Sequence, residues 1–259
     1  MTRSQVFTEQ PEKGLFILPG GIFTQDGNCH RDVELKPLTG REEEIITEKD
    51  DEKLVAPLLT QILQNCIKRI GPIKEIDSEL VQNLLIADRD YLLLCLRRLT
   101  FGNKVDARVH CPNEKCGELL DISFNIKDLK ISKKKLGNGI YSVTLSQRAA
   151  YRDENNVVHD KIEFTLPVVG DQEEAAKIYY ENESRALTTL FVRCIKRIGS
   201  ITEINEDLIS SISILARREI ESKIKEFSPN VDLDIKVSCP ECGLQFKSPF
   251  DIHNFFLKN

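Results

Sequence analysis

Four cysteines lie in two short knuckles whose residue types suit a metal ion. The first knuckle reads Cys111-Pro112-Asn113-Glu114-Lys115-Cys116-Gly117, and the second reads Cys239-Pro240-Glu241-Cys242-Gly243. Proline fixes one backbone angle after the first cysteine, and glycine tolerates the left-handed conformation after the second. Two such knuckles supply four thiolates, the complete ligand set of a tetrahedral zinc site. We therefore predict one Zn2+ bound by Cys111, Cys116, Cys239 and Cys242.

A site made of four thiolates has no open coordination position, so its expected role is structural and not catalytic. The same ligands also suit iron, and two unrelated reduced pairs are the interpretation that needs no metal. His110 and His253 are neighbouring alternative ligands, although four cysteines already complete the set.

The other four cysteines stand singly. Cys66, Cys95 and Cys194 fall in apolar helical patterns and are predicted to be core thiols, because unpaired cysteine behaves as a small hydrophobic residue. Cys29 is in a predicted turn, with no neighbouring base that would make it a nucleophile.

The segments around the knuckles form a tandem repeat. Cys111 and Cys239 are 128 residues apart, and the sequence Cys-Ile-Lys-Arg-Ile-Gly occurs at both 66–71 and 194–199, again 128 apart. The collinear matches are Arg89 with Arg217, residues 30–35 with 159–164 at an offset of 129, and residues 40–44 with 170–174 at 130. A fixed period of this kind indicates a duplicated structural unit.

The repeat divides the chain into an N-terminal tail (1–13), repeat unit 1 with the first knuckle (14–130) and repeat unit 2 with the second (131–259). The predicted fold class is α+β, and each unit holds a β-hairpin, helices and a knuckle. Because each unit contributes half of the ligands, we expect the knuckles to join as one split zinc ribbon on a pseudo-twofold axis. Metal binding in such sites is worth about 10–16 kcal/mol in model peptides, so metal removal is expected to separate or loosen the halves.

Alternating apolar residues and turn signals predict strands at the start of each unit. In unit 1 they fall at 14–18, 21–24 and 32–35, with a hairpin turn at 26–28. In unit 2 they fall at 140–145 and 161–165. Strands at 105–109 and 120–124 are expected to enter and leave the first knuckle.

Helices are expected between these strands. Thr39 and Glu42 form a predicted capping box, with the hydroxyl on a free amide and the carboxylate reaching back. Apolar periodicity predicts helices at 53–70 and 78–86, and Asp88 is expected to cap a further helix at 89–99.

The last of these helices differs between the units. In unit 1 it is apolar nearly all round, whereas its unit 2 counterpart reads as an amphipathic surface helix. A helix that is apolar all round is buried either by its own chain or by a partner. The candidate partner-binding residues are Tyr91, Leu92, Leu94 and Leu96.

The amino-acid composition excludes several classes of function. The chain has 259 residues, 41% hydrophobic and 30% charged, with a net charge of −5 and a pI near 5.6. This is a globular composition, and its acidic balance argues against a protein that coats nucleic acid. No apolar run is long enough to span a membrane, and the N-terminus lacks a secretory signal, so we expect a cytoplasmic protein with reduced thiols.

The motifs that would carry catalysis are absent from the sequence. It contains no phosphate loop, dinucleotide fingerprint, HExxH or GxSxG motif. His30 and His159 occupy equivalent positions in the two units, which is typical of structural residues. We therefore predict a protein that is not an enzyme and has no small-molecule substrate.

Three segments of unit 1 resemble a known family. They are residues 18–21 with 30–43, residues 87–102, and residues 109–112 with Cys116-Gly117. In this order they resemble the T4-type bacteriophage baseplate family, which includes hub subunits and hub assembly proteins of contractile tails, with relatives in contractile injection systems. Unit 2 departs from the pattern at 216–219 and 227–229, so it is expected to keep the zinc half-site and framework only.

The resemblance implies a non-enzymatic structural or assembly component of a baseplate hub, whose partners are other hub or wedge proteins. It also implies a location in the cytoplasm of the producing or host bacterium, or in the virion or injection-system baseplate. The alternative is a nucleic-acid-binding zinc ribbon, in which Lys68-Arg69 and Lys196-Arg197 would form two matched basic spots.

Overall fold

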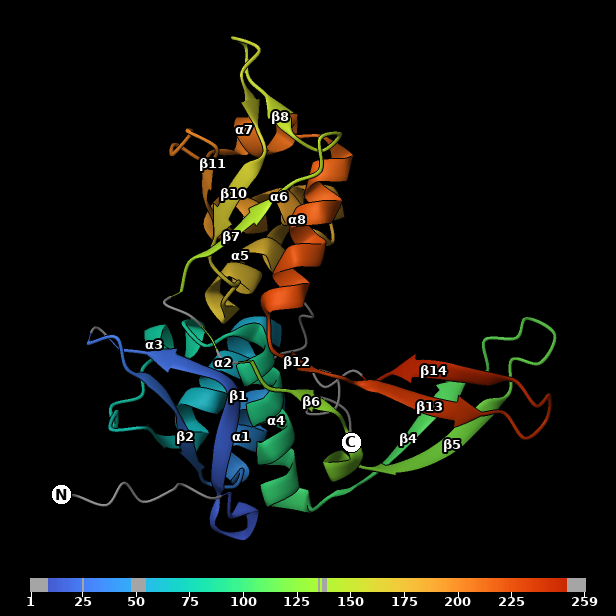
Figure 1. The fold of residues 1–259 in the computed structure, drawn as a ribbon. Helices are drawn as coiled ribbons and strands as arrows, with labels where there is room; N and C mark the ends of the chain where they lie inside the picture. Colours follow the sequence, from blue (N-terminus) through green and yellow to red (C-terminus); the bar gives the residue numbers. More distant parts are fainter. Residues whose placement is uncertain (1–8, 25, 48–54, 135, 137–138, 251–259) are drawn as a thin grey trace.

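The computed structural model describes residues 9–24, 26–47, 55–134, 136 and 139–250, and shows two bodies and an arm (Figure 1). Residues 9–103 form the N-terminal body and residues 139–228 form the C-terminal body. Residues 104–125 and 234–249 form the arm, which extends to one side of the two stacked bodies (Figure 1). The fold is mixed α+β with several small sheets, as predicted.

The N-terminal body packs helices against one three-stranded antiparallel sheet. Its elements are η1 (Pro11–Lys13), β1 (Leu15–Phe23), β2 (Cys29–Leu35), α1 (Gly40–Thr47), α2 (Val55–Cys66), β3 (Ile67–Ile70), α3 (Ser78–Gln82) and α4 (Ile86–Phe101). The strand order is β1-β2-β3, with Phe16 opposite Val33 and Val33 opposite Ile70. The two predicted strands at 14–18 and 21–24 form the single strand β1, which carries a register irregularity between Ile17 and Ile22.

The C-terminal body has the same order of sheet and helices. Its elements are β7 (Tyr141–Thr144), β8 (Tyr151–Arg152), β9 (Val158–His159), β10 (Lys161–Phe164), α5 (Val169–Tyr179), α6 (Glu183–Cys194), β11 (Ile195–Ile198), α7 (Glu206–Ser211) and α8 (Ile214–Phe227). Its sheet has the order β11-β10-β7, and β8 pairs with β9 in a separate hairpin. Thus β10, α5, α6, β11, α7 and α8 follow one another as β2, α1, α2, β3, α3 and α4 do.

The arm consists of two antiparallel hairpins that come from distant parts of the chain. Its strands are β4 (Lys104–His110) with β5 (Leu119–Asn125), and β13 (Asp234–Ser238) with β14 (Gln245–Pro249). At its base, η3 (Ile126–Asp128) leads to β6 (Ile131–Ser132), which pairs with β12 (Asn230–Val231) just after α8. The hairpins therefore leave the bodies from one place and lie side by side (Figure 1).

The helix predicted at 53–70 is wrong at its C-terminal end. It stops at Cys66, and the repeated Ile-Lys-Arg-Ile forms the strand β3. Ile67 and Ile70 are buried while Lys68 is exposed, because the segment pairs with β2 at the edge of the sheet. The second copy, β11, makes the same pairing with β10. Long-range strand pairing thus overrides a local apolar pattern that continues the helical period.

The predicted cap at Asp88 is also wrong. Leu85 is the N-cap of α4, and Asp88 lies within the first turn. Its carboxylate is fully buried and accepts hydrogen bonds from the backbone amides of Gly20 and Gly21, at 2.7 and 2.8 Å. The side chain therefore ties α4 to β1 across the body.

The capping box at Thr39 forms only in part. The Glu42 carboxylate accepts a hydrogen bond from the Thr39 backbone amide at 2.8 Å, as predicted, but the Thr39 hydroxyl donates to the same carboxylate and not to a helix amide. In the C-terminal body, Asp171 accepts from the Val168 amide in the same way. Thr39 and Val168 are thus equivalent, as are Glu42 and Asp171, and each pair is 129 residues apart. The predicted match of residues 40–44 with 170–174, at an offset of 130, is therefore wrong by one residue.

The two bodies share a buried polar interface. The Glu173 carboxylate on α5 is 6% exposed and accepts hydrogen bonds from the Thr60 hydroxyl and from Gln82 Nε2, the latter at 2.7 Å. Arg89, 1% exposed, donates through Nη1 to Gln172 Oε1 at 2.6 Å. Because buried polar groups are costly without partners, these bonds fix how α5 sits against the N-terminal body.

Candidate metal centre

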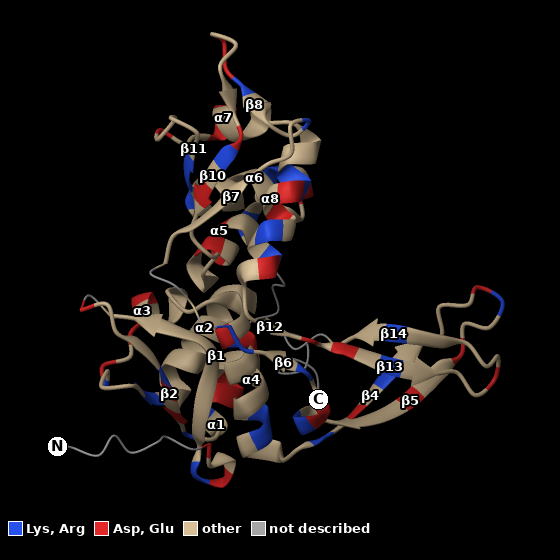
Figure 2. Ribbon diagram, in the orientation of Figure 1, with Lys and Arg blue, Asp and Glu red and all other residues tan. Residues whose placement is uncertain are grey.

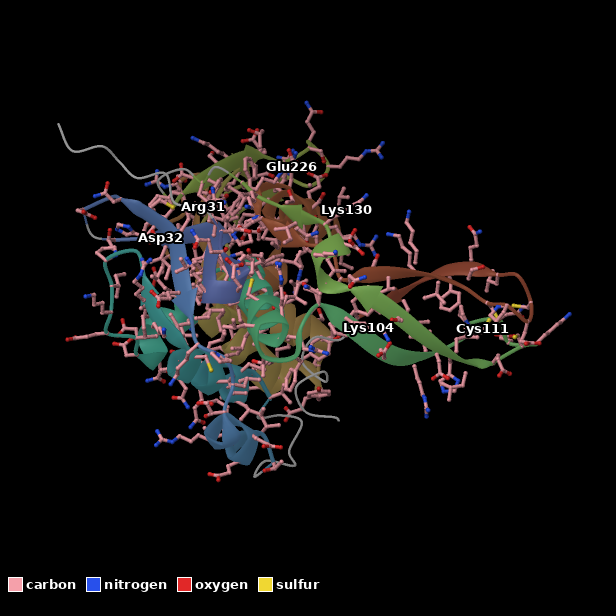
Figure 3. The ribbon with its side chains drawn as sticks, turned by 90° about the horizontal axis from the view of Figure 1, so that it is seen from below. Arg31, Asp32, Lys104, Cys111, Lys130 and Glu226 are labelled. Carbon is pink, nitrogen blue, oxygen red and sulfur yellow. The ribbon has the colours of Figure 1, made fainter. Side chains whose placement is uncertain are left out.

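The two knuckles form the turns at the tip of the arm. β4 ends at His110, opposite Leu119 of β5, and β13 ends at Ser238, opposite Gln245 of β14. Each knuckle lies between such a pair of residues, and the labelled Cys111 is at the far end of the arm from the bodies (Figure 3). Antiparallel pairing therefore carries both pairs of cysteines to the same place.

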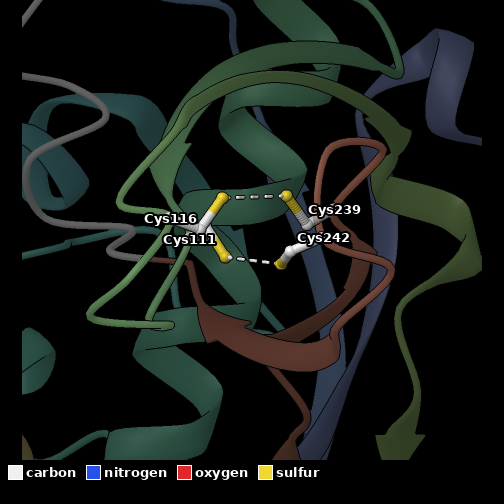
Figure 4. A group of neighbouring side chains, drawn as sticks. All are labelled: Cys111, Cys116, Cys239 and Cys242. Carbon is white, nitrogen blue, oxygen red and sulfur yellow. Dashed lines mark hydrogen bonds between the residues drawn. The ribbon is translucent and has the colours of Figure 1, made fainter.

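The structure brings all four predicted ligands together. The Sγ atoms of Cys111, Cys116, Cys239 and Cys242 all lie within 4.8 Å of one another. Cys111 Sγ is 3.6 Å from Cys242 Sγ, and Cys116 Sγ is 3.8 Å from Cys239 Sγ (Figure 4). Each short contact joins one knuckle to the other, so neither knuckle forms the group alone.

This donor set fits a tetrahedral metal ion. Four sulfurs at about 2.3 Å from a zinc ion lie about 3.8 Å from one another, close to the two short contacts seen here. The cysteines could therefore bind a metal ion with little movement. The geometry is common to several thiophilic metals, and it supplies a closed site without a position for substrate.

Backbone hydrogen bonds shape each knuckle. The Cys116 and Gly117 amides both donate to the Asn113 carbonyl, at 2.8 and 2.9 Å, and the Gly243 amide donates to the Cys239 carbonyl at 2.9 Å. Gly117 and Gly243 have φ angles of 60° and 72°, the left-handed conformation predicted for the residue after the second cysteine. Both knuckles therefore close with a left-handed glycine directly after the second cysteine.

The thiols do not ionise alike. The backbone amide of Leu244 lowers the pKa of Cys242 to about 7. The pKa of Cys111 is raised to about 12, since hydrogen bonding by the Asn113 amide is outweighed by burial and by the neighbouring sulfurs. Four thiolates so close together would repel one another, and a cation among them would offset this repulsion.

The arm has only a small apolar core of its own. Its buried members are Cys111, Leu120, Val237 and Cys239, packed by half-buried neighbours such as Phe246. Each body, by contrast, has a large cluster of fully buried side chains. Two short hairpins with so little buried apolar surface are marginal by themselves, so a metal at the tip would matter most to the arm.

The alternative ligands and the single cysteines have other surroundings. His110 Nδ1 lies 3.3 Å from the Gly117 carbonyl oxygen. Within the described ranges, the group of side chains that could hold a metal ion contains cysteines alone, and His253 lies outside the described residues. Cys66, Cys95 and Cys194 are buried as predicted, and burial raises the pKa of Cys66 to about 12. Cys29 is exposed.

The candidate partner-binding residues lie in the core of the N-terminal body. Tyr91, Leu92, Leu94 and Leu96 are all at most 5% exposed. The chain itself buries the apolar helix α4, which is the first of the two alternatives left open by the sequence. In this conformation these side chains offer no surface to a partner.

The two equivalent histidines each pack against a glycine. A Cβ atom on Gly71 would meet the His30 ring, and one on Gly199 would meet the His159 ring, in both cases at less than 3 Å. His159 Nε2 also lies 3.2 Å from Asp153 Oδ2, and His30 Nε2 lies 3.2 Å from Thr24 Oγ1. The pairing supports the structural interpretation of both histidines.

Three of the four basic residues considered for nucleic acid have acidic neighbours, and the fourth, Lys196, donates through Nζ to the Arg193 carbonyl oxygen at 2.7 Å. Lys68 Nζ is 3.0 Å from Glu34 Oε1, Arg69 pairs with Asp32, and Arg197 Nε is 3.6 Å from Glu163 Oε2. Lysine and arginine alternate with aspartate and glutamate over both bodies and the arm (Figure 2). The Lys68-Arg69 and Lys196-Arg197 pairs therefore do not form a basic surface.

Within the described residues, no helix is both long enough and apolar enough to cross a lipid bilayer.

Comparison with known proteins gives one informative similarity. The family model described as T4 bacteriophage base plate protein matches residues 23–257, which include both knuckles, the C-terminal body and the N-terminal body from the end of β1 onward. Neither the curated proteins nor the solved structures contain a match.

Proposed function

The chain belongs to the T4 bacteriophage base plate protein family, and we propose that it is a non-enzymatic structural or assembly component of the baseplate hub in a contractile tail or injection system. We further propose that a single structural Zn2+, bound by Cys111, Cys116, Cys239 and Cys242, stabilises it. The family gives the broad role as a phage baseplate protein. The hub location and the zinc are our inference.

The observation that carries the zinc proposal is the meeting of four sulfurs from two distant knuckles at the tip of the arm. A closed thiolate site supplies a cross-link between chain segments and no reaction centre. The absence of a catalytic motif in the sequence agrees with a role in assembly.

The zinc would join two halves of a duplicated protein. We propose repeat units at 14–130 and 131–259, preceded by a tail at 1–13. The shared order of elements, the repeated strand Ile-Lys-Arg-Ile and the equivalent His–Gly contacts support this division. The arm is then a split zinc ribbon in which each unit supplies one hairpin.

The sequence predicts that metal removal separates or loosens the two halves. We propose that removal affects only the arm. The bodies are held to each other by the contacts of Glu173 and Arg89 and by the hydrogen bond from the Val169 amide to the Leu84 carbonyl, none of which involves the knuckles. We therefore expect chelation to open the arm while the bodies stay together. An ordered arm that extends from the bodies is suited to contact with hub or wedge proteins.

A complementation experiment tests the assembly role. A deletion strain should fail to build contracting particles, and the wild-type gene should restore them. The double variant Cys239→Ser/Cys242→Ser should restore few particles, whereas Cys29→Ser, which changes an exposed thiol outside the arm, should restore them fully. Normal particles in the deletion strain would contradict the proposal.

Mass spectrometry of purified particles tests the location. Finding the chain in the virion or injection-system baseplate would support a structural component. Finding it only in the cytoplasm of infected cells, bound to hub proteins, would support an assembly factor. The nucleic-acid alternative is not proposed, since three of the four basic residues that suggested it pair with carboxylates.

A further inference from the structure

The four sulfur-bearing side chains at the tip of the arm differ in their access to solvent. Cys111 and Cys239, the first cysteine of each knuckle, are 4% and 1% exposed. Cys116 is half-buried, whereas Cys242 is exposed. The second knuckle therefore presents one cysteine to solvent while the other three are partly or fully covered. A reagent in solution meets the Cys242 side chain before it meets any other cysteine of the group.

The charges at the tip favour neutral reagents. Glu114, Glu118 and Glu241 are exposed on or directly beside the knuckles, and Lys115 is the one basic residue of either knuckle. Four thiolates around one divalent cation would add further negative charge. An anionic oxidant such as oxidised glutathione is repelled by such a surface, whereas a neutral peroxide is not.

A second sulfur lies within reach of Cys242. Cys111 Sγ is 3.6 Å from Cys242 Sγ, and a disulfide bond is about 2.05 Å long, so the two atoms must approach by about 1.5 Å. The remaining two sulfurs, of Cys116 and Cys239, lie 3.8 Å apart. Both contacts join the first knuckle to the second (Figure 4). Disulfide bonds along them would link the two hairpins of the arm to each other.

We propose that Cys242 is the site at which the arm reacts with peroxides, and that Cys111 is the cysteine that then forms a disulfide bond with it. The Cys242 thiolate attacks one oxygen of hydrogen peroxide, the O–O bond breaks, and a sulfenic acid and hydroxide result. The Cys111 thiolate attacks the Cys242 sulfur, the S–S bond forms, and a second hydroxide leaves. Two electrons pass from the two cysteines to the peroxide.

This reaction would replace one cross-link of the arm by another, and it rests on the proposed metal site. The disulfide bond removes two of the four ligands, and Cys116 and Cys239 alone are too few to retain a tetrahedrally bound ion. The bond between Cys111 and Cys242 still holds the two knuckles together. Because disulfides are rare in the cytosol and persist outside the cell, a chain carried out in a particle would keep its arm closed by this bond.

Limited alkylation tests which cysteine reacts first. The full-length Cys29→Ser protein lacks the exposed thiol outside the arm. It is treated with a small amount of iodoacetamide, a neutral reagent, and mapped by peptide mass spectrometry. Cys242 should be modified at least tenfold faster than Cys111 and Cys239. Modification of any other cysteine of the group as fast as Cys242 would overturn the proposal.

Oxidation with hydrogen peroxide tests the pairing. Non-reducing peptide mapping of the same protein should find the Cys111–Cys242 disulfide, and a chromogenic chelator should detect released zinc as the bond forms. A disulfide between Cys239 and Cys242, or a Cys242 that stays reduced, would overturn the proposal. A native chain without zinc would contradict the proposed metal site, but the order of modification and the pairing would still decide this inference.

Glu241 allows a test of the selection by charge. Glu241→Gln should speed the reaction of Cys242 with oxidised glutathione several-fold at low salt, and should leave the reaction with hydrogen peroxide unchanged. Glu203→Gln, which removes an exposed carboxylate from the C-terminal body, should change neither rate. Unchanged reaction with oxidised glutathione in Glu241→Gln would contradict the preference for a neutral oxidant.

Discussion

Cys111 Sγ lies 3.6 Å from Cys242 Sγ, although 131 residues separate the two cysteines along the chain. One belongs to the hairpin that follows α4, and the other to the hairpin that follows α8. The contact closes the arm at its tip, just as the β6–β12 pair closes it at its base. A metal at this point would hold an element whose own apolar core is small.

Chelation should therefore act on the arm alone. Treating the native protein with a strong zinc chelator is expected to raise amide hydrogen exchange in β4, β5, β13 and β14, because the metal holds two marginal hairpins together. Protection in α2 and α6 should remain, since these helices lie in well-packed bodies. Equal loss of protection in the arm and in both bodies would contradict this prediction.

The interface between the bodies should depend on one buried carboxylate. Glu173→Ala is expected to lower the free energy of unfolding by about 1–3 kcal/mol, because it leaves the Thr60 hydroxyl and the Gln82 amide without their partner. Urea unfolding measures this value.

Glu174→Ala is the matched control for that substitution. Glu174 is the next residue on the same helix, but its side chain is 44% exposed and pairs with Lys177. Exposed pairs contribute little, so the expected change is below about 1 kcal/mol. Equal losses of unfolding free energy for the two substitutions would show that the buried hydrogen bonds of Glu173 stabilise the protein no more than the ion pair of Glu174.

The sequence predicted the metal centre better than it predicted the interface. The knuckles carry their signal locally, because proline, glycine and the spacing of two cysteines all lie within a few residues. Glu173 carries none, since its partners Thr60 and Gln82 are 113 and 91 residues away and nothing in its neighbourhood marks it as buried.

The two wrong predictions of secondary structure, at 67–70 and at Asp88, also arise because local sequence does not show distant partners. Ile67–Ile70 continues the apolar period of α2, so a local pattern favours helix, and only pairing with β2 makes the segment a strand. Asp88 has the residue type of a helix cap, but its position opposite Gly20 and Gly21 gives its carboxylate different donors. In both cases the deciding partner is distant in the sequence.

Replacing the glycine of a His–Gly contact by alanine should destabilise the protein, because the added methyl group would clash with the histidine ring. Gly199 has a φ angle of 58°, and a Cβ there would lie 2.3 Å from His159 Nδ1. Gly199→Ala is therefore expected to destabilise the protein by at least about 1–2 kcal/mol, from the left-handed backbone alone. Thermal unfolding of the variant measures this loss.

Gly40→Ala provides the control. Gly40 begins α1, and a Cβ there meets nothing within 4 Å. The substitution should be neutral or should stabilise by up to about 1 kcal/mol, since it reduces the freedom of the unfolded chain. A Gly199→Ala variant as stable as Gly40→Ala would contradict the packing described here.

Asp88 should give the protein a specific dependence on pH. Burial raises the pKa of Asp88 to about 6, from an ordinary value of 3.8, against the opposing effect of the Gly20 and Gly21 amides. The folded chain thus holds this proton more tightly than the unfolded chain. The stability that the group contributes is complete below about pH 4 and is lost as the pH rises through about 6, a total of about 3 kcal/mol.

Comparison with Asp88→Asn isolates this effect. Unfolding free energies measured between pH 4 and pH 7 should fall more steeply for the wild type than for the variant, which has no proton to lose. Parallel curves for the two proteins would show that Asp88 does not titrate in this range.

The most direct test of the account is the metal content and coordination of the purified native protein. Elemental analysis should find one zinc ion per chain, and X-ray absorption at the zinc edge should show four sulfur neighbours at about 2.3 Å. Cys242→Ser should lose this signal, and Cys29→Ser should keep it. A native chain without bound metal, or zinc surrounded by nitrogen and oxygen, would contradict the claim that one ion joins the two knuckles.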